Sequence, residues 1–173
     1  MGNDATRGRV IVARKNKGPV TRIDASSYSL NIDASDRTTL NALLDQLRDV
    51  LMNDSSSEIA RRLFPAAYHQ DEQHEQEYQR LMRDELVTSR LHSIQQVEEF
   101  LADDSVGLLT FAQLDAFSAS LNSVRLVLGT LLGVGEADED LDDEDPRTDE
   151  LALYNFLSWL LENAIQALMD SSV

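Results

Sequence analysis

Apolar residues recur every three or four positions along most of this chain, the pattern of amphipathic helices that bury one face. The first stripe predicts a helix from about residue 36 and contains Leu40, Leu43, Leu44, Leu47 and Leu51. A further stripe, capped by Asp71, runs to Leu86 and resumes five residues later at Leu91, which predicts a kink or a new helix near Thr88 and Ser89. The last stripe predicts a helix over 148–170.

The helix predicted before residue 134 is the most apolar, and we expect it to be the centre of a helical bundle. Thr110 and Gln113 form a capping box at its start. Its buried seam is predicted to contain Leu114, Phe117, Leu121, Val124, Leu128 and Leu131. A second stripe on the same helix is small or polar and contains Ser118, Asn122, Arg125, Gly129 and Gly133.

Arg125 on this polar stripe needs a partner, because a buried unpaired charge is strongly destabilising. The last helix has a polar stripe of its own, on which Glu162 is the natural counter-ion. We therefore predict a structural ion pair between Arg125 and Glu162. The alternative is a pocket in which Arg125 holds a carboxylate or phosphate ligand. Gly129 is expected to let a neighbouring backbone approach closely.

The N-terminal part differs from the rest, since 9–13, 20–23 and 28–32 are short and rich in β-branched or alternating apolar residues. They predict a small antiparallel hairpin or meander over 9–32. The expected fold class is therefore α+β, mainly α, in a single domain over 1–173, with helices over 36–134 and 148–170.

The net charge of −16 is unevenly distributed. The acidic run over 135–147 predicts a mobile, self-repelling loop. In contrast, 1–22 hold six basic residues and one acid. One alternative function is therefore a nucleic-acid-binding transcriptional regulator that uses the basic hairpin, but the hairpin lacks aromatic residues for base stacking and most of the surface repels nucleic acid.

Residues 69–77 hold two histidines and several acids, which are ligands that suit Zn²⁺ or Fe²⁺. A second alternative is therefore a metal-dependent enzyme whose weak ligand candidates are His69, Asp71, His74 and Glu77. We expect no metal and no cofactor, because negative side chains at a helix start also complement the helix dipole and no second ligand motif occurs.

No feature of the sequence supports a familiar catalytic mechanism. The chain has no cysteine, no phosphate-binding glycine loop and no glycine-flanked serine. It also has no secretion signal and no run of 18 uncharged apolar residues, so we expect a cytoplasmic protein that does not cross a membrane.

A short capped helix before Pro65 ends in a sequence rich in interface residue types. It predicts a corner that is either packed on the core or presented to a partner. The interaction candidates are Arg62, Leu63, Phe64, Pro65 and Tyr68, together with Trp159 of the last helix.

Three segments of the chain carry a resemblance to a known family. They are Arg-Leu-Phe-Pro-Ala-Ala-Tyr at 62–68, Leu-Asn-Ser-Val-Arg-Leu-Val-Leu-Gly-Thr at 121–130 and Tyr-Asn-Phe-Leu-Ser-Trp-Leu-Leu-Glu at 154–162. In these segments the chain resembles an actinobacterial domain-of-unknown-function family, number twenty-seventeen. Its members have no assigned activity and are encoded beside the Clp-protease adaptor that recognises N-terminal degrons. The resemblance implies a partner in regulated proteolysis.

The leading hypothesis is a non-enzymatic cytoplasmic protein-interaction module, linked to Clp-dependent proteolysis. We expect the Clp machinery or its adaptor as partner, and self-association through apolar helix faces as a further use of the same surface.

Overall fold

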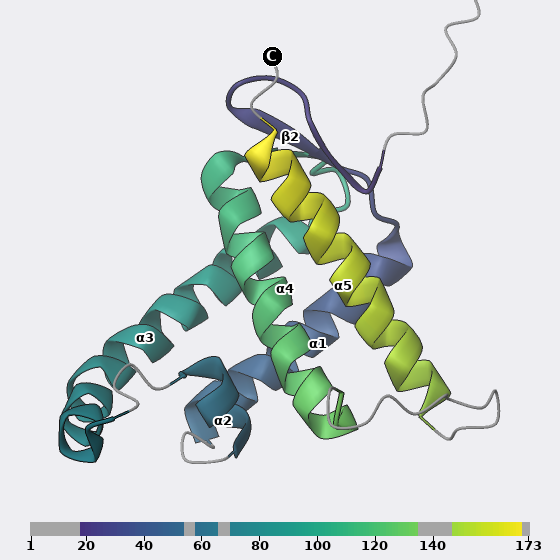
Figure 1. Cartoon of the computed structure of the whole chain (residues 1–173). Helices are drawn as coiled ribbons and strands as arrows, with labels where there is room; N and C mark the ends of the chain where they lie inside the picture. Colours follow the sequence, from purple (N-terminus) through teal and green to yellow (C-terminus); the bar gives the residue numbers. More distant parts are fainter. Residues whose placement is uncertain (1–17, 54–57, 66–69, 135–146, 171–173) are drawn as a thin grey trace, which may run out of the picture.

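In the computed structural model, the chain forms a helical bundle with a small sheet at one end (Figure 1). The structure describes residues 18–53, 58–65, 70–134 and 147–170. The elements in chain order are β1 (Val20–Arg22), β2 (Ser27–Leu30), α1 (Ala34–Asn53), α2 (Glu58–Leu63), α3 (Glu72–Leu101), β3 (Leu108–Thr110), α4 (Phe111–Leu132) and α5 (Thr148–Met169). The expected mainly-α α+β class is confirmed. Within the described ranges, no helix is long and apolar enough to cross a bilayer.

Helix α4 is the centre of the bundle, as predicted. It contacts α1, α2, α3 and α5 as well as strands β2 and β3. Its start has the predicted capping box of Thr110 and Gln113, and it ends at Gly133, whose positive φ of 66° forms a left-handed cap. The predicted seam is buried as far as Val124, but Leu131 is 66% exposed, so the seam does not continue to the end of the helix.

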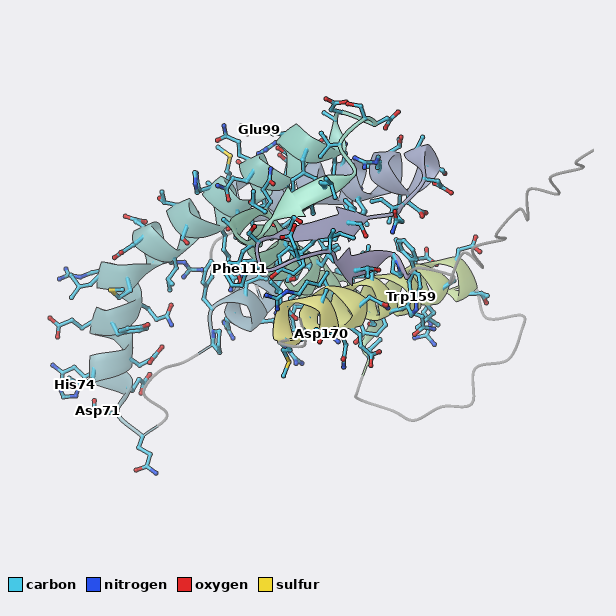
Figure 2. The ribbon with its side chains drawn as sticks, turned by 90° about the horizontal axis from the view of Figure 1, so that it is seen from above. Asp71, His74, Glu99, Phe111, Trp159 and Asp170 are labelled. Carbon is cyan, nitrogen blue, oxygen red and sulfur yellow. The ribbon has the colours of Figure 1, made fainter. Side chains whose placement is uncertain are left out.

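Helices α1 and α3 pack on each other and on α4. The α1 stripe is confirmed, since Leu40, Leu44, Leu47 and Leu51 are all buried. Helix α3 is unbroken over 30 residues, and its axis bends, so a kink rather than a new helix is present (Figures 1 and 2). The Thr88 hydroxyl donates to the Asp84 carbonyl at 2.7 Å, a back-bond that favours bending of a helix.

The sheet is only partly the one that the sequence predicted. Strands β1 and β2 form the expected antiparallel hairpin, with Val20 opposite Leu30. The third strand is β3, whose Thr110 lies opposite Ser27, although only helices were predicted over 36–134. That prediction was wrong because three residues are too few for an apolar period to be recognised. The strand predicted at 9–13 and the acidic loop lie outside the described residues.

A buried arginine joins α1 to the end of α3. Arg37 is only 4% exposed. Its guanidinium donates to the carbonyls of Phe100 at 3.0 Å, Asp103 at 3.3 Å and Val106 at 2.6 Å. These carbonyls belong to the last turn of α3 and the turn before β3, where the negative end of the helix dipole favours a cation. Arg37 therefore fixes the position of β3 relative to the helices.

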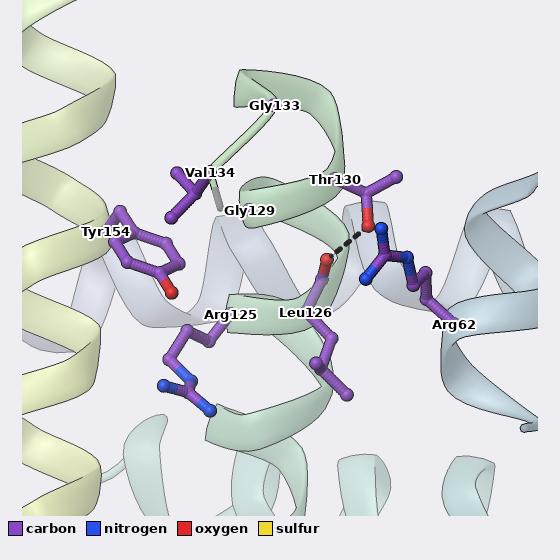
Figure 3. Close-up of a pocket in the computed structure, with 8 residues that line it drawn as sticks. All are labelled: Arg62, Arg125, Leu126, Gly129, Thr130, Gly133, Val134 and Tyr154. Carbon is purple, nitrogen blue, oxygen red and sulfur yellow. Dashed lines mark hydrogen bonds between the residues drawn. The ribbon is translucent and has the colours of Figure 1, made fainter. Parts of the chain in front are cut away.

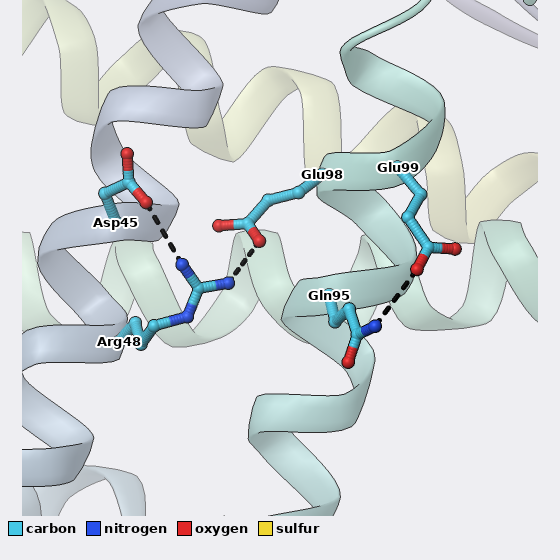
Figure 4. Close-up of polar contacts among 5 residues, drawn as sticks. All are labelled: Asp45, Arg48, Gln95, Glu98 and Glu99. Atoms are coloured by element: carbon cyan, nitrogen blue, oxygen red, sulfur yellow. Dashed lines mark hydrogen bonds and ion pairs between the residues drawn. The ribbon is translucent and has the colours of Figure 1, made fainter.

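A second arginine of α1 makes an ion pair nearer the surface (Figure 4). Arg48 contacts Asp45 at 3.1 Å in its own helix and also Glu98 of α3. On α3, Gln95 donates to Glu99 at 3.1 Å. The Arg48 side chain is 32% exposed, so solvent screening weakens this pair.

The close approach of a neighbouring backbone that was predicted at Gly129 is wrong, because the group that lies against Gly129 is a side chain. A Cβ atom at Gly129 would lie 3.0 Å from Cε2 of Tyr154 on α5. Glycine in the last turn of α4 therefore leaves room for the Tyr154 ring, which would have to shift to accommodate a Cβ atom.

We expect Arg37→Ala to lower the free energy of unfolding by about 3 kcal/mol, because it leaves the Phe100 and Val106 carbonyls without their side-chain donor, whereas the Asp103 carbonyl still accepts from the Val106 amide. Arg48→Ala is the matched control in the same helix and is expected to change it by less than about 1 kcal/mol. Urea unfolding measures both. Equal effects of the two substitutions would show that Arg37 has no special role.

Gly129→Ala is expected to destabilise the wild-type chain by about 1 to 2 kcal/mol, because Tyr154 occupies the space. In a Tyr154→Ala background the same change is expected to stabilise it by up to about 1 kcal/mol, through helix propensity alone. A double-mutant cycle by urea unfolding measures the difference. The same value in both backgrounds would refute the packing explanation.

Candidate functional site

The predicted ion pair between Arg125 and Glu162 is wrong. Glu162 lies on the exposed face of α5, and within the described residues no carboxylate oxygen lies within 4.0 Å of Arg125. Arg125 instead donates to the Asn122 side chain at 3.3 Å, while its Nε is buried without a hydrogen-bond partner in the described part. The reason is the register of α5 against α4, because Tyr154 packs beside Gly129. Glu162 lies about two turns beyond Tyr154 and on the outer side of α5, so it does not lie opposite Arg125.

A pocket of about 210 Å³ lies at the C-terminal end of α4 (Figure 3). Arg125 and Tyr154 lie on the side of α4 that faces α5, whereas Arg62 extends from α2 and lies beside Thr130 on the other side. The Thr130 hydroxyl is used within the helix, where it donates to the Leu126 carbonyl at 2.8 Å. The two guanidinium groups therefore do not converge on one anion.

The corner after α2 is packed on the core. Leu63 and Phe64 are 1% and 7% exposed, so these two interaction candidates are not available to a partner. Arg62 and Pro65 are exposed, and Tyr68 lies outside the described residues. Of the two interpretations of this corner, the structure favours the core-packed one for Leu63 and Phe64.

Phe64 is covered by two arginines of α3. The guanidinium carbon of Arg90 lies 5.2 Å from the ring centroid and that of Arg83 lies 5.8 Å from it. At these distances both cations are attracted by the ring face. Arg90 also donates to the Leu63 carbonyl at 2.7 Å, so it fixes the α2 corner against α3.

The same Arg90 lines a pocket of about 230 Å³ between α1, α3 and α4. It donates to the Ser123 hydroxyl at 2.6 Å, and this hydroxyl donates in turn to the Ala119 carbonyl at 2.9 Å. The pocket is also lined by Ser120, which is 3% exposed and whose hydroxyl has no hydrogen-bond partner in the described part. A buried hydroxyl without a partner destabilises a fold by about 1 to 3 kcal/mol.

Arg90 has no acidic partner within 4.0 Å among the described residues. Burial lowers the pKa of its guanidinium from the ordinary value. The group nevertheless keeps its charge at neutral pH, since arginine does not lose its proton in proteins. Sequence reasoning did not select Arg90, although it stands four residues from both Leu86 and Ile94 and hence on the apolar face of α3.

The weak metal candidates are only partly within the described residues. At the exposed start of α3, His74 Nδ1 lies 2.5 Å from Asp71 Oδ2, and Asp71 caps the helix by accepting from the His74 amide. This amide hydrogen bond is the main cause that holds the pKa of Asp71 below its usual range. Glu77 is exposed and His69 lies outside the described residues. No group of three or more potential ligands occurs in the described ranges.

The N-terminal part of α3 projects from the bundle (Figures 1 and 2). None of the described side chains over 72–93 is buried, and Leu81 is 63% exposed. Trp159 is 49% exposed on α5 and lies against Phe156 with 6.1 Å between ring centroids. Figure 2 shows Trp159 far from the tip of α3 that Asp71 and His74 mark, so the two exposed features are separate surfaces.

Comparison with known proteins gives a match at the level of the family. No curated protein matches the chain, and no solved structure matches it. Residues 16–168, which are most of the chain and include every described element except the last residue of α5, match the model of the family described as Domain of unknown function (DUF2017). The chain belongs to this family of unknown function.

Proposed function

We propose that this chain is a non-enzymatic protein-interaction module and that a partner protein covers the projecting part of α3. The observation that carries the proposal is the unequal burial of that helix. Its buried residues are Ile94, Val97, Phe100 and Leu101, all in the last third. The earlier turns contribute no buried side chain to the described fold.

A helix whose first turns are not packed within its own fold is stabilised when a partner packs against those turns. Helices of this kind gain most of their stability from packing of an apolar face, and short isolated helices are marginal in water. Over 72–82, here called the α3 arm, Leu81 and Met82 provide apolar surface next to the charged residues Glu77 and Arg80. An exposed apolar group with a polar rim is the usual composition of an interface centre.

The partner that we propose is the Clp-protease adaptor that recognises N-terminal degrons. Support comes from the resemblance to family members that are encoded beside this adaptor. Self-association of two copies through the α3 arm is the competing occupant, and the experiment below separates it from adaptor binding.

We expect the full chain to bind the purified adaptor, and Leu81→Glu to weaken the complex at least about tenfold, or ~1.4 kcal/mol. Met52→Glu is the matched control, because Met52 on α1 is 65% exposed and lies outside the α3 arm. Isothermal titration calorimetry with the adaptor, and separately with the Clp ATPase, measures the affinities.

Sedimentation of the chain alone tests self-association. If the chain forms a dimer that Leu81→Glu dissociates and does not bind the adaptor, the partner of the α3 arm is a second copy of this chain and the adaptor proposal is wrong. Adaptor binding that Leu81→Glu and Met52→Glu weaken equally would remove the α3 arm from the proposal.

A further inference from the structure

We propose that the pocket between α1, α3 and α4 binds a small organic carboxylate, held by the Arg90 guanidinium and the Ser120 hydroxyl. This inference is independent of the proposed interaction through the α3 arm, since a different set of residues carries it. The pocket of about 230 Å³ is smaller than the roughly 300–1,000 Å³ typical of sites for drug-sized molecules, so its ligand is a small one.

The polar side of the pocket contains a hydroxyl group that lacks a hydrogen-bond acceptor within the described fold. Three serines of α4 are buried. Ser118 and Ser123 donate their hydroxyl protons to carbonyls four residues earlier, both at 2.9 Å. Ser120 makes no such bond within the described part, and this residue lines the pocket that Arg90 also lines. A ligand oxygen is the partner that this hydroxyl lacks.

Arg90 retains capacity for an anion after its bonds within the fold are counted. Each of its two terminal nitrogens makes one hydrogen bond, to the Ser123 hydroxyl and to the Leu63 carbonyl. A guanidinium has five N–H donors in a planar fork that matches a carboxylate. Further N–H groups are therefore left for a ligand.

The local charge favours an anion although the whole chain is acidic. Arg83 and Arg90 both lie over Phe64, and in the described part no carboxylate oxygen lies within 4.0 Å of either guanidinium. A half-buried positive charge of this kind is stabilised by any anion that enters the pocket, and the low local dielectric strengthens the attraction.

The opposite side of the pocket is apolar and favours an aliphatic part of the ligand. Leu47, Leu86 and Ile94 line it beside the serines. Inorganic phosphate would contact the donors but leave this apolar lining uncovered. A short aliphatic chain that ends in a carboxylate satisfies both sides, and it comes either from a free acid or from the C-terminus of a peptide.

The experiment measures the unfolding temperature and the binding heat of the full chain with pentanoate, pentanamide, N-acetyl-leucine and inorganic phosphate. A ligand that binds only the folded state raises this temperature in proportion to the logarithm of its concentration. We expect pentanoate to raise it and its neutral amide to leave it unchanged. Tighter binding of N-acetyl-leucine than of pentanoate would identify a peptide C-terminus as the source, and the reverse order a free acid.

Ser120→Ala is expected to weaken pentanoate binding about tenfold, the effect of losing one hydrogen bond to a charged group. Ser118→Ala is the matched control, because Ser118 is buried on the same helix but bonded to the Leu114 carbonyl. Neither change removes a contact that holds Arg90, and urea unfolding verifies that both variants fold. Equal shifts with acid and amide, binding of phosphate alone, or equal loss of binding in the two variants would overturn the proposal.

Discussion

The fold depends on the hydrogen bonds that Arg37 donates to the end of α3. A helix end leaves backbone carbonyls without partners, and here they are buried where α3 turns toward the sheet. One guanidinium satisfies the last turn and the following loop together, and its charge complements the helix dipole. The position of β3, and through it the start of α4, is thus coupled to a residue in the first turn of α1.

Two further arginines join separate elements of the fold by donating hydrogen bonds to backbone carbonyls. Arg90 joins the α2 corner to α3 and α4 through a carbonyl, a hydroxyl and a ring face. Arg22 bonds the Asp170 carbonyl beyond the end of α5. In these contacts the acceptors are backbone carbonyls, a hydroxyl and a ring, not carboxylates. Arg48 differs from these arginines, since it pairs with the carboxylates of Asp45 and Glu98.

The sequence predicted the parts of the fold that repeat. The leucines of α1 and the capping box of α4 each have a period or a spacing that specifies one local structure. Strand β3 has no such period, and the partner of Arg125 depends on the register of α4 against α5, which the Gly129 and Tyr154 contact sets. Arg37 and Arg90 did leave a signal, since each stands at helical spacing from buried leucine or isoleucine. What the sequence could not give was their acceptors, because backbone carbonyls of distant loops have no residue signature.

The central place of α4 has a consequence for how the protein comes to be folded. Residues 18–101 supply the hairpin and three helices, yet the helix against which these pack and the third strand of the sheet both follow them in the chain. During synthesis the N-terminal half therefore emerges from the ribosome before the helix that covers its α4-facing apolar side chains has been made. The core around α4 is therefore completed only after the last third of the chain has been synthesised.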